Sequence, residues 1–555
     1  MTVSDLLLKV LHSFGVRHVF GIPGDAINDV TDALRRQDKI DFVQVRHEEA
    51  GAFAASAQAK LTGRLAACLG TAGPGGVHLL NGLYDAKMDH TPVIAITGQV
   101  ATSELGTSQH QEVNLERLFT DVAVYSRTVT TAEQLPNVFV EACSAAIAHR
   151  GVAHVSIPTD VSGNRLSGDG PFTWAQPAEG EITPAAEDLH KAVTLIDNAE
   201  KIVILAGIGC AEARVEMLAL AQRIGAPIVR SLRAKEVIDD DHPMCVGGLG
   251  MLGGPPASKA MEDCDLLIMA GTDFPYQDFY PAGTDAIQID SVPTQIGKRY
   301  PVTVGLAGHA GPVLSALAEA VEEKPKRDFL KRMQTQMEDW REDQASAETS
   351  NATPIHPARI MRELSGAAPD DAVFVCDTGT VNAWTARHLH IKRGQRFTLS
   401  GGLASMAFAL PGAIGAQLAY PERAVFALCG DGGFSMLMAD FVTAVRNRLP
   451  ITVIILNNRK LAFISLEQKA KGLPDHATDL LNPDFAAFAE ACGGLGLRVD
   501  RPEGIREALD IAAVSEKPAI IDIAVDPEAL IVPPRISARE AMNFGLAKIR
   551  EKLAN

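Results

Sequence analysis

An acidic residue among glycines and a pair of asparagines are the residues of this chain whose spacing most plainly indicates chemistry. Asp431 lies in the glycine-rich segment 430–433, directly after the apolar run 424–429, and Asn457-Asn458 follow a second apolar run, 451–456. Each run has the length and composition of a buried parallel strand. Because the carboxyl ends of neighbouring parallel strands open into one crevice, we expect Asp431 and the asparagines to lie close together.

Carboxylate and amide oxygens are hard ligands that suit Mg2+, an ion that commonly keeps water and binds the phosphate oxygens of a ligand. The glycines beside Asp431 would let backbone N–H groups and a helix N-terminus approach such a phosphate. The pattern therefore predicts a site at which a divalent metal holds a diphosphate. Either piece alone is more often an ordinary turn or strand end, so the prediction depends on finding both.

The composition narrows the classes of partner and location. With 555 residues the chain is too long for one core, and its net charge of −17 disfavours nucleic acid and anionic membranes as partners. The eight cysteines include no Cys-x-x-Cys pair and read as reduced core residues, which favours the cytoplasm. The first residues lack the pattern of a signal peptide, and no stretch of 18 uninterrupted apolar residues predicts a membrane span.

Short apolar runs alternate with amphipathic helical stretches in three separate regions of the chain, which is the rhythm of βα units and predicts an α/β fold with parallel sheets. A Gly- and Pro-containing polar stretch and a highly charged helical stretch separate these regions. The predicted segments are 1–165, a linker 166–185, 186–322, a charged helical linker 323–354, 355–530, and a tail 531–555.

Further segments resemble one known family. Phe20-Gly21-Ile22-Pro23-Gly24, Arg46-His47-Glu48-Glu49 and 70–76, taken with the Asp431 and asparagine segments, resemble the pyruvate oxidase and acetolactate synthase family of thiamine diphosphate enzymes. The resemblance runs over nearly the whole chain. It is strongest with the flavin-containing pyruvate oxidases, in particular the bacterial quinone-dependent pyruvate dehydrogenases, through 271–276 and 429–438.

The resemblance implies three Rossmann-like open parallel-sheet domains: a pyrimidine-binding domain at 1–165, a central flavin-type domain at 186–322 and a diphosphate-binding domain at 355–530. It also implies thiamine diphosphate, Mg2+ and FAD as cofactors. The flavin assignment depends mainly on 271–276 and on the strand end 289–291, because a short glycine turn is a weak signal by itself. Some acetolactate synthases bind flavin without using it for redox, so bound FAD would not by itself indicate oxidation. The residues implied to line the flavin are Gly207, Gly209, Gly271, Thr272, Phe274 and Asp290.

Several roles carry over from the family. Glu48 would contact the aminopyrimidine and promote proton transfer, which requires a dry pocket. Met406 would be the pliable apolar wedge that bends the cofactor, and Gly402 would accept the aminopyrimidine through its carbonyl. By local sequence alone, Glu48 would be a surface residue and Met406 an ordinary core residue. Asp431, Asn458 and the main-chain oxygen of Lys460 would hold the metal. The other implied cofactor contacts are Pro23, Gly24, Thr71, Asn81, Gly379, Thr380, Leu403, Gly430, Gly432, Gly433 and Leu461.

A second set of residues would line the substrate pocket. Gln111, Ile464 and Glu467 fall at pocket positions, and Phe463 falls where an aromatic ring lies toward the flavin. His110 departs from the oxidases, which have an aromatic residue there, and is similar to the His-Gln of catabolic acetolactate synthases. Thr378 replaces a valine. Both departures make the pocket more polar and put pyruvate as sole substrate in doubt.

The implied activity is oxidative decarboxylation of a 2-oxo acid, above all pyruvate, to acetate or acetyl phosphate, with electrons passing to FAD and then to a quinone or oxygen. An acetolactate synthase-type carboligase or a non-oxidative decarboxylase is the enzymatic alternative, and His110 favours carboligation. A non-catalytic cofactor-binding protein is disfavoured because Glu48, Asp431 and Asn458 are all present.

The family geometry implies at least a homodimer, commonly a homotetramer, because each site would form between two subunits. At the C-terminus, Met542, Leu546, Ile549 and Leu553 share an apolar face at helical spacing. Such a stretch is more often a docking helix than a membrane anchor, so contact with a membrane quinone is left unsupported.

Overall fold

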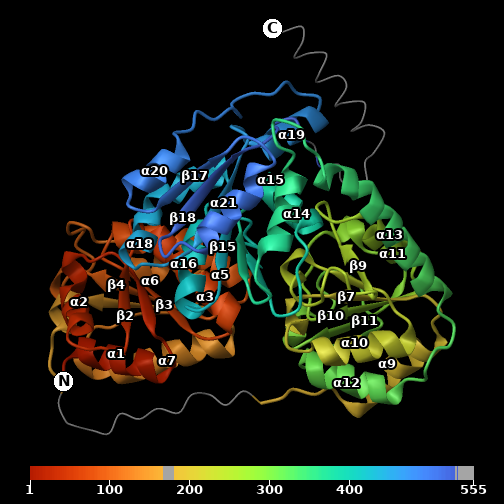
Figure 1. The fold of residues 1–555 in the computed structure, drawn as a ribbon. Coiled ribbons are helices and arrows are strands. Elements are labelled where there is room, and N and C mark those ends of the chain that lie inside the picture. Colours follow the sequence, from red (N-terminus) through yellow and green to blue (C-terminus); the bar gives the residue numbers. More distant parts are fainter. Residues whose placement is uncertain (167–179, 530, 532–533, 535–555) are drawn as a thin grey trace.

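The computed structural model describes residues 1–166, 180–529, 531 and 534 (Figure 1). Most of the predicted linker 166–185 and nearly all of the tail 531–555, including its predicted apolar face, lie outside the described residues. The described chain contains three six-stranded sheets in which all strands run parallel, so the predicted α/β class with three parallel sheets is confirmed.

The first sheet belongs to the N-terminal domain. Its strand order is β2 (Asp41–Gln44), β1 (His18–Gly21), β3 (Ala66–Gly70), β4 (Val93–Gln99), β6 (Val152–Pro158) and β5 (Ala123–Thr128). Every residue of β3, β4 and β6 is buried, as expected for central strands that are covered on both faces. The covering helices include α1 (Val3–Ser13), α3 (Glu48–Thr62), α5 (Leu80–Met88) and α7 (Leu135–Ala148).

The C-terminal domain repeats this strand order. Its sheet runs β14 (Arg396–Leu399), β13 (Val373–Cys376), β15 (Val425–Gly430), β16 (Thr452–Asn457), β18 (Ala519–Ala524) and β17 (Leu495–Val499). In both outer domains the second strand in the chain lies at the edge beside the first, and the last two strands are exchanged. The two domains therefore share one topology although their sequences show no literal repeat.

The central domain has a different order. Read from its β9 edge, the sheet runs β9 (Cys245–Gly248), β8 (Ile228–Arg230), β7 (Ile202–Ala206), β10 (Leu266–Ala270), β11 (Asp285–Asp290) and β12 (Val304–Ala307). This is the 3-2-1-4-5-6 order of the doubly wound dinucleotide-binding fold, with its switch point between β7 and β10. Helix α13 (Asp328–Glu348) follows within the charged segment and packs against α14 (Pro357–Ala367) of the C-terminal domain.

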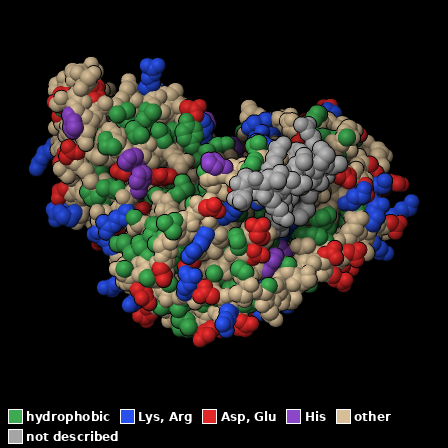
Figure 2. All heavy atoms as spheres, turned by 90° about the horizontal axis from the view of Figure 1, so that it is seen from above, with side chains coloured by type: hydrophobic (Ala, Val, Ile, Leu, Met, Phe, Trp, Pro, Cys, Tyr) green, Lys and Arg blue, Asp and Glu red, His purple; other side chains and the backbone are tan. Residues whose placement is uncertain are grey.

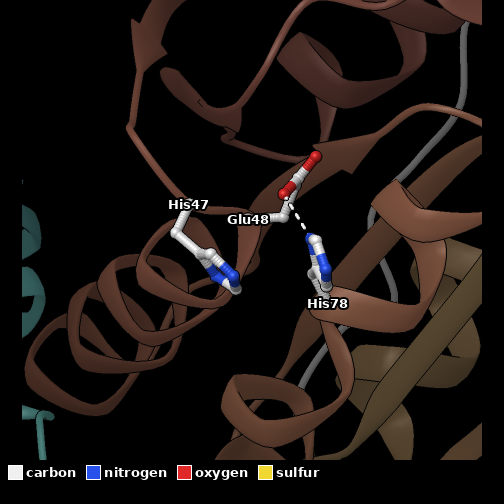
Figure 3. Close-up of side chains that lie close together, drawn as sticks. All are labelled: His47, Glu48 and His78. Carbon is white, nitrogen blue, oxygen red and sulfur yellow. Dashed lines mark hydrogen bonds and ion pairs between the residues drawn. The ribbon is translucent and has the colours of Figure 1, made fainter. Parts of the chain in front are cut away.

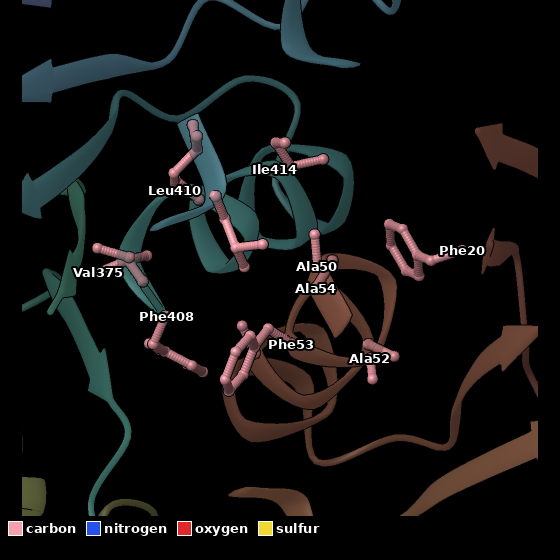
Figure 4. Close-up of a cluster of buried hydrophobic side chains, with 14 of the residues drawn as sticks. Phe20, Ala50, Ala52, Phe53, Ala54, Val375, Phe408, Leu410 and Ile414 are labelled. Carbon is pink, nitrogen blue, oxygen red and sulfur yellow. The ribbon is translucent and has the colours of Figure 1, made fainter. Parts of the chain in front are cut away.

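The two outer domains share one hydrophobic core. Helix α3 of the first packs against α16 (Ala409–Ala419) of the second, and Phe53 meets Phe408 edge to face with ring centroids 5.7 Å apart (Figure 4). A Cβ on Gly415 would lie 2.2 Å from the carbonyl oxygen of Ala54, so the helices approach closely only because a glycine stands there. This contact fixes the N-terminal domain against the C-terminal one.

All eight cysteines are free thiols, and seven of them are buried as predicted for core residues, whereas Cys492 is half-buried. Within the part of the chain that the structure describes, no helix combines the length and apolar character needed to cross a bilayer.

The acid stability of the N-terminal domain should depend on His154. Its ring is buried, stacks on Phe119 with centroids 3.9 Å apart, and bonds Thr97 Oγ1 and Ser126 Oγ at 2.9 Å each. Burial lowers the pKa of His154 to about 3. Below about pH 6.5, the ordinary histidine pKa, His154 binds a proton in the unfolded chain but stays neutral in the folded chain. The free energy of unfolding therefore falls as the pH falls from about 6.5, by up to about 1.4 kcal/mol per pH unit.

We therefore expect the thermal midpoint of the wild-type protein to fall between pH 6.5 and 5 more steeply than that of His154→Gln. Differential scanning fluorimetry across this range measures both curves. Parallel curves would contradict the assignment of this acid sensitivity to His154.

Candidate cofactor site

Asp431 and the asparagines lie at the tips of neighbouring strands. Strand β15 ends at Gly430, where α17 (Asp431–Leu437) begins, and the adjacent β16 ends at Asn457. Asn482 joins the two tips, because its Nδ2 donates to Asp431 Oδ2 at 2.6 Å and to Asn457 Oδ1 at 3.0 Å. The sequence interpretation missed Asn482, whose only signal was its place in a polar Asn-Pro-Asp turn.

The carboxylate of Asp431 is nearly fully buried. Burial raises the pKa of Asp431, while hydrogen bonds from Asn482 and from the backbone amides of Gly432 and Arg459 oppose that rise. A divalent cation would favour the ionised form far more strongly than these hydrogen bonds do. Beside it, Asn458 Oδ1 accepts the backbone N–H of Lys460 at 2.9 Å. The oxygen-rich corner fits the predicted magnesium site.

The neighbouring strand β13 offers room for a phosphate. A Cβ added to Gly379 or to Gly430 would meet no atom within 4 Å, so both residues border open space. Thr378 and Asn382 are close to Gly379 in the sequence. Thr378 Oγ1 and Asn382 Oδ1 are buried and have no hydrogen-bond partner in the described chain. Buried polar atoms without partners are costly, and a bound polar group would satisfy them. These residues therefore fit a metal-held diphosphate.

Three of the predicted cofactor contacts converge beside this corner. A Cβ on Gly432 would lie 3.0 Å from Leu461 Cδ2 and 3.4 Å from the terminal methyl of Met406. Gly402 lies four residues before Met406 in the same loop, against Met88 of the N-terminal domain. The structure thus brings Met406 to the glycine turn that follows β15.

Glu48 begins helix α3 and is buried, with 7% of its surface exposed. Its Oε2 lies 3.0 Å from His78 Nδ1, and the two side chains point toward each other (Figure 3). The ring of His47 stacks on that of His78 with centroids 4.4 Å apart, and His47 Nδ1 accepts the backbone N–H of Glu49 at 3.2 Å. A buried carboxyl beside an imidazole can hold or pass a proton. The sequence interpretation missed His78, which is distant in the chain and has no local motif.

Other predicted residues of the N-terminal domain meet at the ends of β1 and β3. A Cβ on Gly24 would lie 2.4 Å from Thr71 Cβ, so Gly24, which follows Pro23, is a glycine for reasons of space. Asn81 lies elsewhere on the domain, and its Nδ2 donates to Glu49 Oε1 at 2.7 Å and to Ser405 Oγ at 3.1 Å. Asn81 therefore bridges the N-terminal domain to the loop that carries Met406.

The predicted substrate residues divide between two domains. Phe463, Ile464 and Glu467 lie on α19 (Ala462–Ala470), and Phe463 lines a small pocket together with Thr380 and Lys460. His110 is exposed and Gln111 is half-buried, both in the N-terminal domain. A pocket that contains all of them requires an N-terminal and a C-terminal domain to face each other.

Gly207, Gly209, Gly271 and Thr272 lie at the switch point of the central sheet, where β7 and β10 end, and Asp290 ends the adjacent strand β11. A Cβ on Gly207 would lie 2.0 Å from the carbonyl oxygen of Gly271, and a Cβ on Gly209 would lie 2.8 Å from the Cα of Gly271. These glycines let the ends of β7 and β10 close on each other, so packing alone explains their identity. Thr272 Oγ1 is buried without a partner in the described chain, and burial raises the pKa of Asp290. The crevice fits a nucleotide but does not single out FAD.

Comparison with known proteins decides the family. Residues 1–118 match the thiamine pyrophosphate enzyme N-terminal TPP binding domain, residues 189–317 the central domain, and residues 377–523 the C-terminal TPP binding domain. The chain belongs to the thiamine pyrophosphate enzyme family. The strand-tip carboxylate, the open glycine-lined space and the buried Glu48 all lie within the two matched TPP binding domains.

Relatives of this thiamine pyrophosphate enzyme extend over nearly its whole length. It is 45% identical to YdaP of Bacillus subtilis, described as a thiamine pyrophosphate-containing protein, over 100% of this chain and 96% of that one. It is 34% identical to the pyruvate oxidase of Lactiplantibacillus plantarum, over 94% and 88%. It is 30% identical to the large subunit of acetolactate synthase isozyme 2 of Escherichia coli, over 98% and 99%.

Replacing Asp431 by Asn should weaken Mg2+-dependent binding of thiamine diphosphate by at least about tenfold, because it removes the charge that faces the cation. Isothermal titration of the cofactor in the presence of Mg2+ measures the change. Asp370→Asn is the matched control, since the Asp370 side chain is 85% exposed and pairs with Lys392. Equal affinities in Asp431→Asn and the control would contradict the metal assignment.

Proposed function

We propose that this thiamine pyrophosphate enzyme oxidatively decarboxylates a 2-oxo acid, with pyruvate as the first candidate. FAD would accept the two electrons and pass them to a quinone or oxygen, and water or phosphate would release the product as acetate or acetyl phosphate. The observation that carries the proposal is the combination, in one chain, of a buried Glu48 carboxyl with a metal corner beside open, glycine-lined space. The 34% identity with a pyruvate oxidase supports the oxidative outcome.

Thiamine diphosphate, when bound, supplies the electron sink for loss of carbon dioxide from the 2-oxo acid. Asp431, Asn458 and the Lys460 carbonyl would hold Mg2+ on its diphosphate. Glu48, oriented by the hydrogen bond to His78, would share a proton with the aminopyrimidine, and its burial keeps that proton from exchanging freely with water.

Two observations favour a second candidate, carboligation. His110 stands where an aromatic residue is found in the oxidases, and the chain is 30% identical to an acetolactate synthase subunit over nearly its full length. A carboligase would join the decarboxylated fragment to a second 2-oxo acid or an aldehyde and would leave the flavin oxidised. A non-catalytic binding protein has no use for the buried Glu48 and Asp431 carboxyls together.

We also propose that the enzyme is a homodimer or homotetramer in the cytoplasm. Three large apolar residues near Asp431, Lys460 and Asn482 in the sequence are exposed. The exposed fractions are 61% for Met436, 47% for Ile464 and 100% for Leu481. Figure 2 shows hydrophobic patches between charged side chains on one face of the molecule. Exposed apolar surface of this kind favours contact with another protein surface, and the N-terminal domain of a second copy would complete the pocket. The eight free thiols support a reducing location.

The reaction is tested by mixing the protein anaerobically with thiamine diphosphate, Mg2+, FAD and pyruvate, with and without inorganic phosphate, and following the absorbance of oxidised flavin. Loss of that absorbance with formation of acetate or acetyl phosphate is the expected result. Release of carbon dioxide from flavin that stays oxidised would move the assignment to the carboligase or a simple decarboxylase.

Replacing Glu48 by Gln should reduce turnover by at least about a hundredfold while leaving cofactor affinity within a few fold, because the amide cannot exchange a proton as the carboxyl does. Steady-state carbon dioxide release and cofactor titration measure the two effects separately. Glu507→Gln, an exposed change on α21 (Gly504–Ala513), is the control. Unchanged turnover in Glu48→Gln would rule out its proposed role.

A further inference from the structure

The segment 400–408, here called the wedge loop, joins β14 to α16 and carries Gly402, Leu403 and Met406. It runs along helix α5 in the opposite direction, with Gly402 against Met88 and Ser405 against Asn81. Ala404 and Ala407 have φ angles of +56° and +70°. Alanine rarely adopts positive φ, so the loop is held in a conformation that its own residues disfavour. Something outside the loop must stabilise it.

Asp89 holds the beginning of the wedge loop. Its Oδ1 accepts the backbone N–H of Gly402 at 2.7 Å, and its Oδ2 accepts that of Gly401 at 3.0 Å. The Asp89 side chain is 0% exposed. One carboxylate from the end of α5, in another domain, thus accepts both amides of the Gly-Gly turn.

Two cations keep Asp89 ionised in this buried place. Lys60 Nζ lies 2.6 Å from Asp89 Oδ2, and Arg233 Nη1 lies 3.2 Å from Oδ1 while Nη2 donates to the Asp89 carbonyl at 2.9 Å. Burial alone would raise the pKa of Asp89, but Arg233 and Lys60 outweigh it and lower the pKa to about 2. Arg233 comes from the central domain, so all three domains meet at this carboxylate.

The turn itself is shaped for this contact. A Cβ on Gly401 would lie 2.3 Å from Arg233 Cδ, and one on Gly402 would lie 2.8 Å from the Met88 carbonyl oxygen. Both glycines are therefore required by the side chain and backbone that press on them. The Asp89 contact therefore fixes the peptide that joins Gly401 to Gly402, directly before the Gly402 carbonyl.

Asp377 holds the other end of the wedge loop. Its Oδ1 accepts the backbone N–H of Phe408 at 3.3 Å and that of Thr378 at 2.9 Å, and Ala407 also donates to its carboxyl. Its Oδ2 lies 2.1 Å from the position that a Cβ on Gly433 would take. The loop is therefore pinned on both sides of Ala404, at Gly401 and Gly402 by Asp89 and at Ala407 and Phe408 by Asp377.

We propose that Asp89 and Asp377 are positioning residues that hold the strained wedge loop ready for the aminopyrimidine and the ring junction of the cofactor. The inference rests on the proposed function only in that the wedge loop contacts thiamine diphosphate. Both residues act through backbone amides of the loop, because their side chains are buried behind it. Arg233, from the central domain, fixes the orientation of the Asp89 side chain.

The test uses the full-length protein with Asp89→Asn, which keeps the shape of the side chain but loses its charge and one acceptor oxygen. We expect its Kd for thiamine diphosphate with Mg2+ to rise about tenfold, equivalent to about 1.4 kcal/mol. The near-ultraviolet circular dichroism of the bound aminopyrimidine should change as well, because that signal reports the environment of the ring rather than the stability of the fold. Asp121→Asn is the matched control, since Asp121 bonds Lys87 on the same helix and its side chain is 72% exposed.

A second change tests the strain directly. Glycine adopts positive φ without cost, so adding Ala404→Gly to Asp89→Asn should recover part of the lost affinity. Arg233→Gln, at a side chain that is only 27% exposed, should weaken binding in the same direction by about two- to fivefold, because Lys60 still neutralises Asp89. These variants keep the test valid where Asp377→Asn fails to fold.

Wild-type affinity and an unchanged dichroism signal in Asp89→Asn, with only a lower thermal midpoint, would overturn the inference and assign Asp89 a purely structural role. Loss of affinity that Ala404→Gly does not relieve would overturn the part played by strain. A wild-type protein that binds no thiamine diphosphate would instead refute the proposed function, so the two failures are distinguishable.

Discussion

The close approach of helices α3 and α16 is the contact on which the rest of the molecule depends. Small residues on both helices allow it, since Gly415 lies directly against the backbone of Ala54 and Gly412 faces Ala57. The core that results is continuous across the two outer domains (Figure 4). Helix α3 begins at Glu48, and α16 begins directly after the wedge loop, so one helix pair sets the relative positions of both functional segments.

Buried ion pairs also join the two outer domains. Along the seam between the domains, Lys60 lies between Asp85 and Asp89, donates to the Leu399 carbonyl at 2.9 Å and covers the Phe408 ring at 4.4 Å. Buried ion pairs add little net stability but are costly to break, because removing one partner strands the other. In the domain placement that the structure shows, Lys60 satisfies both carboxylates and the Leu399 carbonyl at once.

The sequence predicts the fold well because its main signal is local. Apolar runs such as 202–206 and 452–456 are strands, and the residues that follow them reach the edge of the sheet where ligands bind. The placement of Asp431 beside the asparagines follows from the same rule. The family resemblance pointed to Met406 and Gly432, which the structure brings together.

The residues that the sequence did not reveal act over long separations. Asp89 lies 312 residues from Gly401, and His78 lies 30 residues from Glu48, so no spacing rule joins them. Asp377 reads as the end of a strand, and the positive φ of Ala404 and Ala407 contradicts the ordinary preference of alanine. Tertiary contacts determine the positions of these side chains and the positive φ angles, and the local sequence pattern does not predict them.

The shared strand order of the two outer domains has a historical consequence. A chain in which the same arrangement occurs twice, around a central sheet of different order, is most simply explained by duplication of one ancestral domain. Two copies of that ancestor packed through a small-residue helix would already have presented two crevices at the ends of their sheets. Divergence then needed only to place the buried Asp431 carboxyl in one crevice and the buried Glu48 carboxyl in the other, so the difference between the two domains would be younger than the fold that they share.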